Sequence, residues 1–224
     1  MLSELIGTFA LVFVGTGAIM INEITGGTIS HLGIATCFGL VVTAMIYSFG
    51  EISGAHINPA VTLAFWASGR FPLNRVPSYL IAQALGAVIA SACLFFLFPG
   101  YEGNFGATLP SGTWQQSFVF ELILSFLLMQ VIMNVSSGSK ETGIMAGLAI
   151  GVTVWMEALF AGPICGASMN PFRSLAPALV SGNFQFLWIY LIAPVLGCFL
   201  ATLTCRVLKT KECCPIPGSN TPGC

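Results

Sequence analysis

Long apolar runs are the feature that most restricts how this chain folds. Hydrophobic residues occupy 56% of its positions and charged residues only 7%, whereas soluble domains carry about 25% charged residues. A helix needs about 20 apolar residues to cross the hydrocarbon core of a bilayer. Six runs reach about this length, at about 3–22, 33–50, 76–98, 116–136, 143–161 and 185–207. The sequence therefore predicts an all-α membrane protein with six transmembrane helices.

Two further apolar stretches, about 58–68 and 170–180, are too short to span. At about 1.5 Å per residue, each covers only half of the hydrocarbon core. A half-span leaves unpaired backbone groups at mid-membrane, which is tolerated where the backbone is buried in protein or lines a water-filled cavity. We therefore expect two half-helices that meet at a site near the midplane.

Composition excludes several classes of function. The net charge of -1 gives no basic patch, so we expect no nucleic-acid partner. The sequence has no Asp, no Cys-x-x-Cys and no Cys/His spacing typical of a metal site. We expect no metal, no cofactor, no disulfide framework and no enzyme activity.

The basic residues predict the orientation in the membrane. Lys and Arg are enriched in cytoplasmic connections, and here they follow spans two, four and six. They are Arg70, Arg75, Lys140, Arg206, Lys209 and Lys211. We expect both termini in the cytoplasm, with residues 208–224 forming a flexible tail. Arg173 is left on the outer half, where we expect it to serve function rather than topology.

The two halves of the chain match one another at an offset of 111 to 117 residues. The matching pairs are Ile52–Ala60 with Ile164–Phe172, Tyr79–Gly86 with Tyr190–Gly197, and Glu4 with Glu121. Each repeat, about 1–98 and 116–207, holds three spans, so the second copy must be inverted. Inverted repeats place a solute site at their interface, built from discontinuous helices. The sequence predicts one domain over residues 1–207.

The repeated Asn-Pro signature, preceded by Ser/Cys-Gly-Ala, resembles the major intrinsic proteins, the aquaporins and aquaglyceroporins. Arg173, three residues after the second Asn, strengthens this resemblance, which covers about residues 1–207. It implies an aquaporin-like fold and a passive channel. The central pore motif is expected at Asn58, Pro59, Ala60, Asn170, Pro171 and Phe172.

Asn58 and Asn170 are each placed to cap a half-helix, with Pro at its first position. Capping uses the side-chain oxygen, so we expect the amide donors to stay free and point into the lumen. Each half-helix N-terminus carries about half a positive charge. Together these groups are expected to exclude protons and cations. Phe172 departs from the family pattern, which has Ala there, and its ring must pack near the half-helix contact.

The resemblance also implies an outer selectivity filter, formed by Phe38, Ala158, Ala167 and Arg173. Water-selective relatives typically carry His at the position of Ala158. Two alanines opposite Phe38 suit a wider and more apolar mouth, with Arg173 donating to a solute hydroxyl. This pattern most resembles the nodulin-26-like and glycerol-type branches, and favours glycerol, urea and undissociated boric, silicic or arsenious acid as solutes.

Several further residues are expected to support the pore. Glu157 has three interpretations: a partner of Arg173, a lumen carboxylate, or an acceptor for loop backbone. The resemblance implies that Glu4 and Glu121 brace the half-helix loops, and His56 is expected to brace the same region rather than bind metal. Cys165 is interpreted as a small packed residue, with a mercurial-accessible thiol as the alternative.

The main functional prediction is a passive channel for water and small uncharged solutes in a cell or plasma membrane. A strictly water-selective aquaporin and an ion-coupled secondary transporter are the alternatives. The lipid bilayer is one partner, and the resemblance implies a homotetramer with one pore in each subunit.

Overall fold

The computed structural model describes residues 1–136 and 143–208, and all regular structure in this part of the chain is helical. Leu73–Arg75 forms one 3₁₀ turn. The α-helices are α1 (Leu2–Ile24), α2 (Ser30–Ser53), α3 (Pro59–Ala67), α4 (Val76–Leu97), α5 (Trp114–Val135), α7 (Ala146–Cys165), α8 (Pro171–Ser181) and α9 (Leu187–Leu208).

Six of these helices are long and apolar enough to cross a membrane, which confirms the predicted spans. The largest difference in boundary is at α7, which continues through Pro163 to Cys165 instead of ending near residue 161. The fixed φ of Pro is compatible with a helix, although Pro removes one backbone hydrogen bond and its ring crowds the carbonyl four residues earlier. Lys140 and the predicted tail beyond Leu208 lie outside the described residues.

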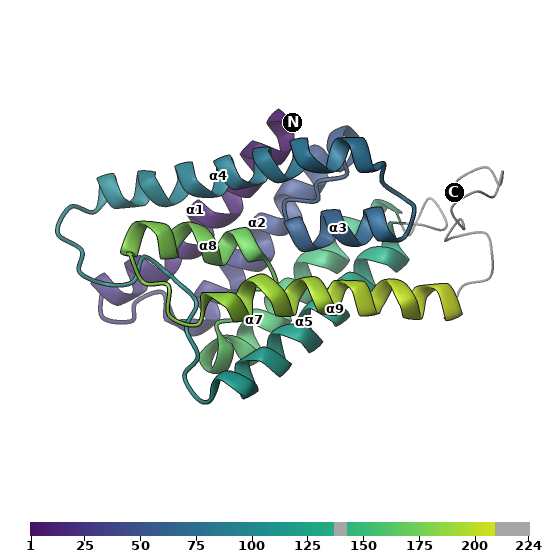
Figure 1. Ribbon diagram of the computed structural model, residues 1–224. Helices are drawn as coiled ribbons and strands as arrows, with labels where there is room; N and C mark the ends of the chain where they lie inside the picture. Colours follow the sequence, from purple (N-terminus) through teal and green to yellow (C-terminus); the bar gives the residue numbers. More distant parts are fainter. Residues whose placement is uncertain (137–142, 209–224) are drawn as a thin grey trace.

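The two short helices α3 and α8 lie end to end between α4 and α9 (Figure 1). The packing repeats across the two halves of the chain, because α1 packs on α4 as α5 packs on α9. Each half-helix also packs against the other half of the chain: α3 contacts α9, and α8 contacts α4. This arrangement places both half-helix N-termini at the centre of the bundle, as the inverted repeat predicts.

Two matching glycines allow close helix crossings. A Cβ atom at Gly86 would lie 2.2 Å from the carbonyl oxygen of Leu5, and one at Gly197 would lie 2.2 Å from that of Leu122. Small residues let helix backbones approach closely in membranes. Both contacts lie beside the glutamates Glu4 and Glu121, so each crossing also fixes the position of a buried carboxylate.

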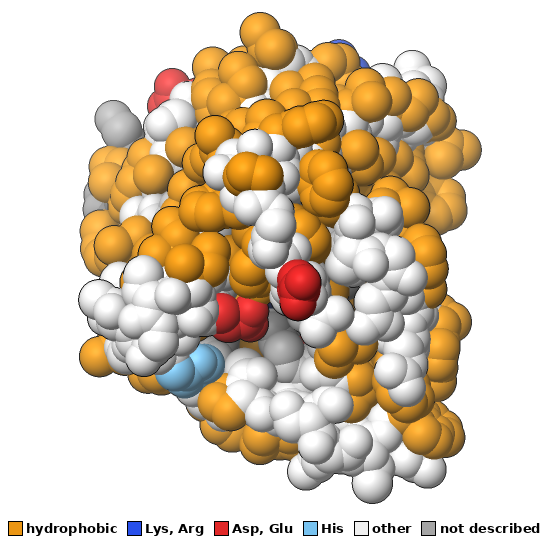
Figure 2. Space-filling model, turned by 90° about the vertical axis from the view of Figure 1, so that its left-hand side faces the viewer, with side chains coloured by type: hydrophobic (Ala, Val, Ile, Leu, Met, Phe, Trp, Pro, Cys, Tyr) orange, Lys and Arg blue, Asp and Glu red, His pale blue; other side chains and the backbone are white. Residues whose placement is uncertain are grey.

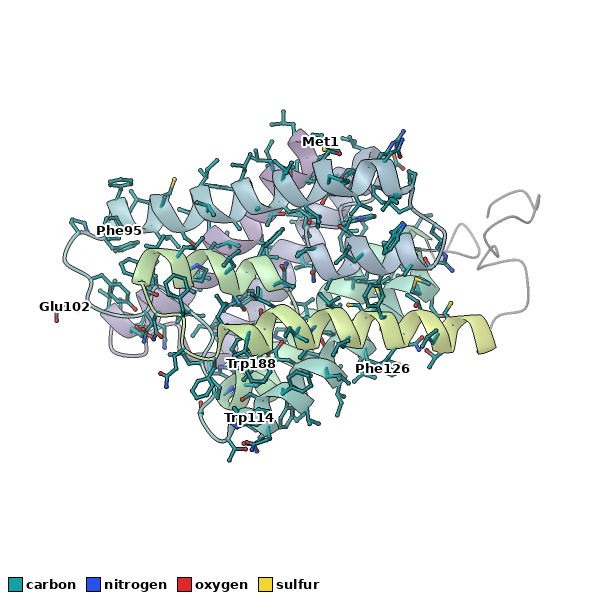
Figure 3. All side chains as sticks on the ribbon, in the orientation of Figure 1. Met1, Phe95, Glu102, Trp114, Phe126 and Trp188 are labelled. Carbon is teal, nitrogen blue, oxygen red and sulfur yellow. The ribbon has the colours of Figure 1, made fainter. Side chains whose placement is uncertain are left out.

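The outer surface fits a lipid environment. Hydrophobic side chains cover much of the periphery in Figure 2, which views the end of the bundle that carries Glu102. Acidic side chains lie beside a central hollow in this view. Trp114 and Trp188 lie close together where α5 and α9 begin (Figure 3), with ring centroids 5.5 Å apart. Trp is enriched at membrane–water interfaces, so this pair is well placed to mark one boundary of the bilayer.

Candidate pore and solute filter

Each half-helix begins with the same cap. Asn58 is extended, and its side-chain oxygen accepts a hydrogen bond from Ala60 N at 2.9 Å. The oxygen of Asn170 accepts from Phe172 N at 3.1 Å and from Arg173 N at 3.3 Å. A Pro occupies the first turn in both cases, where its missing N–H removes a donor that would otherwise lack a partner.

The amide nitrogen of each cap donates one hydrogen bond to protein, which corrects the prediction that these donors stay free. Asn58 Nδ2 donates to Met169 O at 2.8 Å, and Asn170 Nδ2 donates to Ile57 O at 2.9 Å. Each cap therefore binds the loop that precedes the other half-helix. One N–H of each amide is used in this exchange, and the second remains for the lumen.

The two loops before the half-helices share an unusual backbone. Ala55 and Ile57 in the first loop, and Ala167 and Met169 in the second, all have positive φ, between 41° and 53°. Such conformations cost about 1–3 kcal/mol for residues other than Gly and persist only when their surroundings hold them. The repeated pattern shows that both loops are held in one alternating conformation.

Two buried glutamates hold these loops. Glu4 accepts from the backbone N–H groups of His56 and Ile57 at 2.9 and 2.8 Å, and also from Ser53 Oγ and Gln83 Nε2. Glu121 accepts from Ser168 N at 2.7 Å and Met169 N at 2.8 Å. Ile57 and Met169, whose carbonyls accept the Asn cross-bonds, are thus each held through their backbone N–H by a carboxylate.

A cavity of about 1120 Å³ passes both caps. It reaches from Tyr47, Glu51 and Arg70 at one mouth to the predicted filter positions, all four of which line it. Asn58 and Asn170 line its middle, together with His56. The structure therefore brings the predicted pore asparagines and the predicted filter into one continuous space.

At the filter, Arg173 packs its guanidinium over the ring of Phe38, with 5.0 Å from Cζ to the ring centroid. Arg173 Nη1 donates to Gly106 O at 2.7 Å, which anchors the side chain to the connection between α4 and α5. Its Nε has no hydrogen-bond partner among the described residues. The Arg173 side chain lines the same cavity as the small side chains of Ala158 and Ala167.

Glu157 corrects a second prediction. It is buried on α7, and neither carboxylate oxygen has a hydrogen-bond partner within the described part of the chain. It forms no ion pair with Arg173, it accepts no loop N–H, and it is not among the residues that line the cavity. All three interpretations were therefore wrong. Adjacent helix residues differ in direction by about 100°, and Ala158 is the one that faces the pore.

Phe172 points away from the lumen. Its ring packs with Phe9 and Phe13 against a buried cluster that includes Val12 and Ala176. The Asn170 cap and its cross-bond form beside it. The larger side chain at this position therefore fills space between α8 and its neighbours α1 and α4.

His56 and Cys165 contribute to the loops in different ways. His56 Nδ1 lies 3.1 Å from Thr62 Oγ1, and its ring stacks on Phe65. The Cys165 thiol is fully buried, lies outside the cavity lining and receives a 3.4 Å contact from Ala167 N. This burial favours the interpretation of Cys165 as a packed residue. Among the described residues, no group of three metal-ligating side chains is present.

Sequence reasoning missed two tyrosines that also hold the loops. Tyr79 O–H donates to Ser53 O at 2.7 Å, and Tyr190 O–H donates to Cys165 O at 2.8 Å. Both satisfy carbonyls at the ends of spanning helices. The signal was present, because these residues begin the matching segments Tyr79–Gly86 and Tyr190–Gly197, but the match alone gave them no partner.

A cavity that passes two half-helix N-termini inside a bundle of spanning helices defines an integral membrane channel. The model of the family described as Major intrinsic protein matches residues 1–205. Aquaporin NIP1-1 of Zea mays is 49% identical over 196 residues, which cover 88% of this chain and 70% of the relative. Nodulin-26 of Glycine max is 44% identical over 212 residues, covering 95% and 78%.

A solved structure is also similar. The aquaglyceroporin from Plasmodium falciparum superposes with a TM-score of 0.82 at 26% identity, covering 92% of this chain and 94% of that one. The chain belongs to the major intrinsic protein family, as its motifs indicated. It is a membrane channel of the aquaporin type for water and small solutes.

Proposed function

We propose that this channel conducts small uncharged polar solutes, such as glycerol, urea and undissociated metalloid acids, together with water. The observation that carries the proposal is the filter. Ala158 and Ala167 place only small side chains opposite Phe38, and the guanidinium of Arg173 lines the same cavity. A solute hydroxyl or carbonyl oxygen can accept a hydrogen bond from this guanidinium while its carbon face lies on the Phe38 ring.

Protons and ions are excluded by groups at two successive levels of the pore, its middle and its outer constriction. The N-termini of α3 and α8 each direct partial positive charge toward the middle of the cavity. The second amide N–H of Asn58 and of Asn170 holds the oxygen of a passing water, which turns its hydrogens away and interrupts a proton wire. Arg173 adds a fixed positive charge at the outer constriction.

The active form is a homotetramer in the plasma membrane with both termini in the cytoplasm. An even number of spans places the two ends on one side, and the basic residues between spans two and three, Arg70 and Arg75, indicate the cytoplasmic side. Each subunit contains its own cavity, so each conducts independently.

Stopped-flow swelling and shrinkage of proteoliposomes tests the proposal, with water, glycerol, urea and boric acid measured side by side. We expect all four to pass faster than through empty liposomes, at rates that rise linearly with concentration. Water flux without solute flux would show a strictly water-selective channel. Solute flux that saturates and requires a proton or sodium gradient would show a transporter.

Arg173→Val tests the filter assignment in the same vesicles. Loss of the fixed charge should admit small cations that the parent protein excludes, measured by collapse of an imposed potassium gradient. An unchanged cation leak would place the charge barrier elsewhere.

A further inference from the structure

His31, near the start of α2, supplies a hydrogen bond that α7 lacks. Pro163 lies inside α7 and has no N–H, so the carbonyl of Leu159, four residues earlier, has no helical donor. His31 Nε2 lies 2.8 Å from this carbonyl oxygen. Because a carbonyl oxygen only accepts, the imidazole nitrogen must carry the hydrogen.

The neighbouring sequence of α7 leaves room for the ring. A Cβ atom at Gly162 would lie 2.8 Å from His31 Cε1, which is closer than side-chain atoms approach one another. Two adjacent residues of α7 therefore accommodate the imidazole. Pro163 leaves the Leu159 carbonyl without a helical donor, and Gly162 has no side chain that would occupy the space of the His31 ring. An unpaired carbonyl inside a membrane protein is unfavourable. The hydrogen bond from His31 therefore stabilises α7 at the one carbonyl that Pro163 leaves without a donor.

The contact joins two walls of the filter. Leu159 follows Ala158 directly, and Phe38 lies seven residues after His31, two helical turns along α2. Phe38 and Ala158 both line the cavity at the filter. A bond between His31 and the Leu159 carbonyl therefore limits how far the helices that carry Phe38 and Ala158 can separate.

We propose that His31 is a positioning residue that sets the width of the solute filter by holding the Leu159 carbonyl. This inference rests on the proposed function, since the width matters for solutes larger than water. Loss of the bond frees the C-terminal turn of α7, widens the constriction and raises glycerol permeability relative to water.

The test compares the ratio of glycerol to water permeability in proteoliposomes. His31→Phe keeps a ring and removes the donor, whereas His31→Gln keeps an N–H donor. We expect His31→Phe to raise the ratio about two- to tenfold, the factor that one hydrogen bond contributes, and His31→Gln to restore the parent ratio. Thr36→Val is the matched control, because it removes a different bond between α2 and α7, from Trp155 Nε1 at 3.2 Å.

A double-mutant cycle makes the test specific to the unpaired carbonyl. Pro163→Ala restores a helical N–H for Leu159, so His31→Phe should have no effect on the ratio in that background. This combination also tests the proposal if His31→Phe alone fails to fold. An equal effect of His31→Phe in both backgrounds would overturn the inference, as would an equal effect of Thr36→Val.

The two proposals fail in different ways. If the parent protein conducts glycerol and His31→Phe leaves the ratio unchanged, the role of His31 is wrong and the proposed function stands. If the parent protein conducts water and no glycerol, the proposed function fails, and the inference about His31 fails with it.

Discussion

Glu121→Gln tests whether a buried carboxylate holds the second half-helix loop in place. In the parent protein both carboxylate oxygens accept backbone hydrogen bonds, from Ser168 N and Met169 N. The amide keeps one acceptor and turns an NH2 group toward the other N–H. A hydrogen bond to a charged group contributes about 1.5–3 kcal/mol, so we expect a loss of about that size.

The loss is comparable with the strain stored in the loop. Ala167 and Met169 have φ of 41° and 53°, and each such conformation costs about 1–3 kcal/mol. Without one of its two supports, the loop should relax and move the Met169 carbonyl away from Asn58 Nδ2. We therefore expect lower stability and lower water permeability in the same variant.

Two assays measure the outcome. For a chain of this length, the lost hydrogen bond should lower the midpoint of thermal unfolding in detergent by roughly 3–12 °C. Water permeability per protein in proteoliposomes should fall several-fold. Glu157→Gln is the matched control, because this carboxylate is equally buried and has no partner among the described residues; it should leave permeability unchanged and the midpoint unchanged or higher.

The reasoning is refuted if Glu121→Gln unfolds at the parent temperature and conducts water at the parent rate. It is equally refuted if Glu157→Gln lowers both quantities as much as Glu121→Gln does. In that case the carboxylates would stabilise the bundle in general rather than one loop in particular.

Three further predictions concern the filter, a helix crossing and the outer surface. Ala158→His should reduce glycerol flux more than water flux in the vesicle assay, and an equal loss of both would place the constriction elsewhere. Gly197→Ala should separate α5 from α9 and cost about 1–3 kcal/mol, seen as a lower unfolding midpoint, whereas Gly143→Ala, with nothing within 4 Å, should not. Burial and a hydrogen bond to Glu23 raise the pKa of Tyr101 above its usual value of about 10. The contact should therefore stabilise the protein below pH 10 and cease to do so at higher pH, and Tyr101→Phe should abolish this alkaline fall in the unfolding midpoint.

The sequence by itself determined the spans, the half-helices and their caps. Apolar length decides whether a helix crosses the membrane, and an Asn-Pro pair sets a helix start through contacts within a few residues. These are local properties, so residue types and spacings are enough to place Asn58 and Asn170 at the two helix starts. The repeat then fixed the inverted arrangement, because three spans in each half reverse the direction of the second copy.

Only the tertiary structure decided which partner each buried polar group has. Asn58 binds the carbonyl of Met169, 111 residues away, and no local pattern encodes that pairing. Glu157 and Arg173 are 16 positions apart and close to the same filter, yet the direction of one side chain on α7 leaves them unpaired. Hydrogen bonds depend on distances of a few tenths of an ångström and on angle. Such precision comes from how the helices pack, and the local sequence does not contain it.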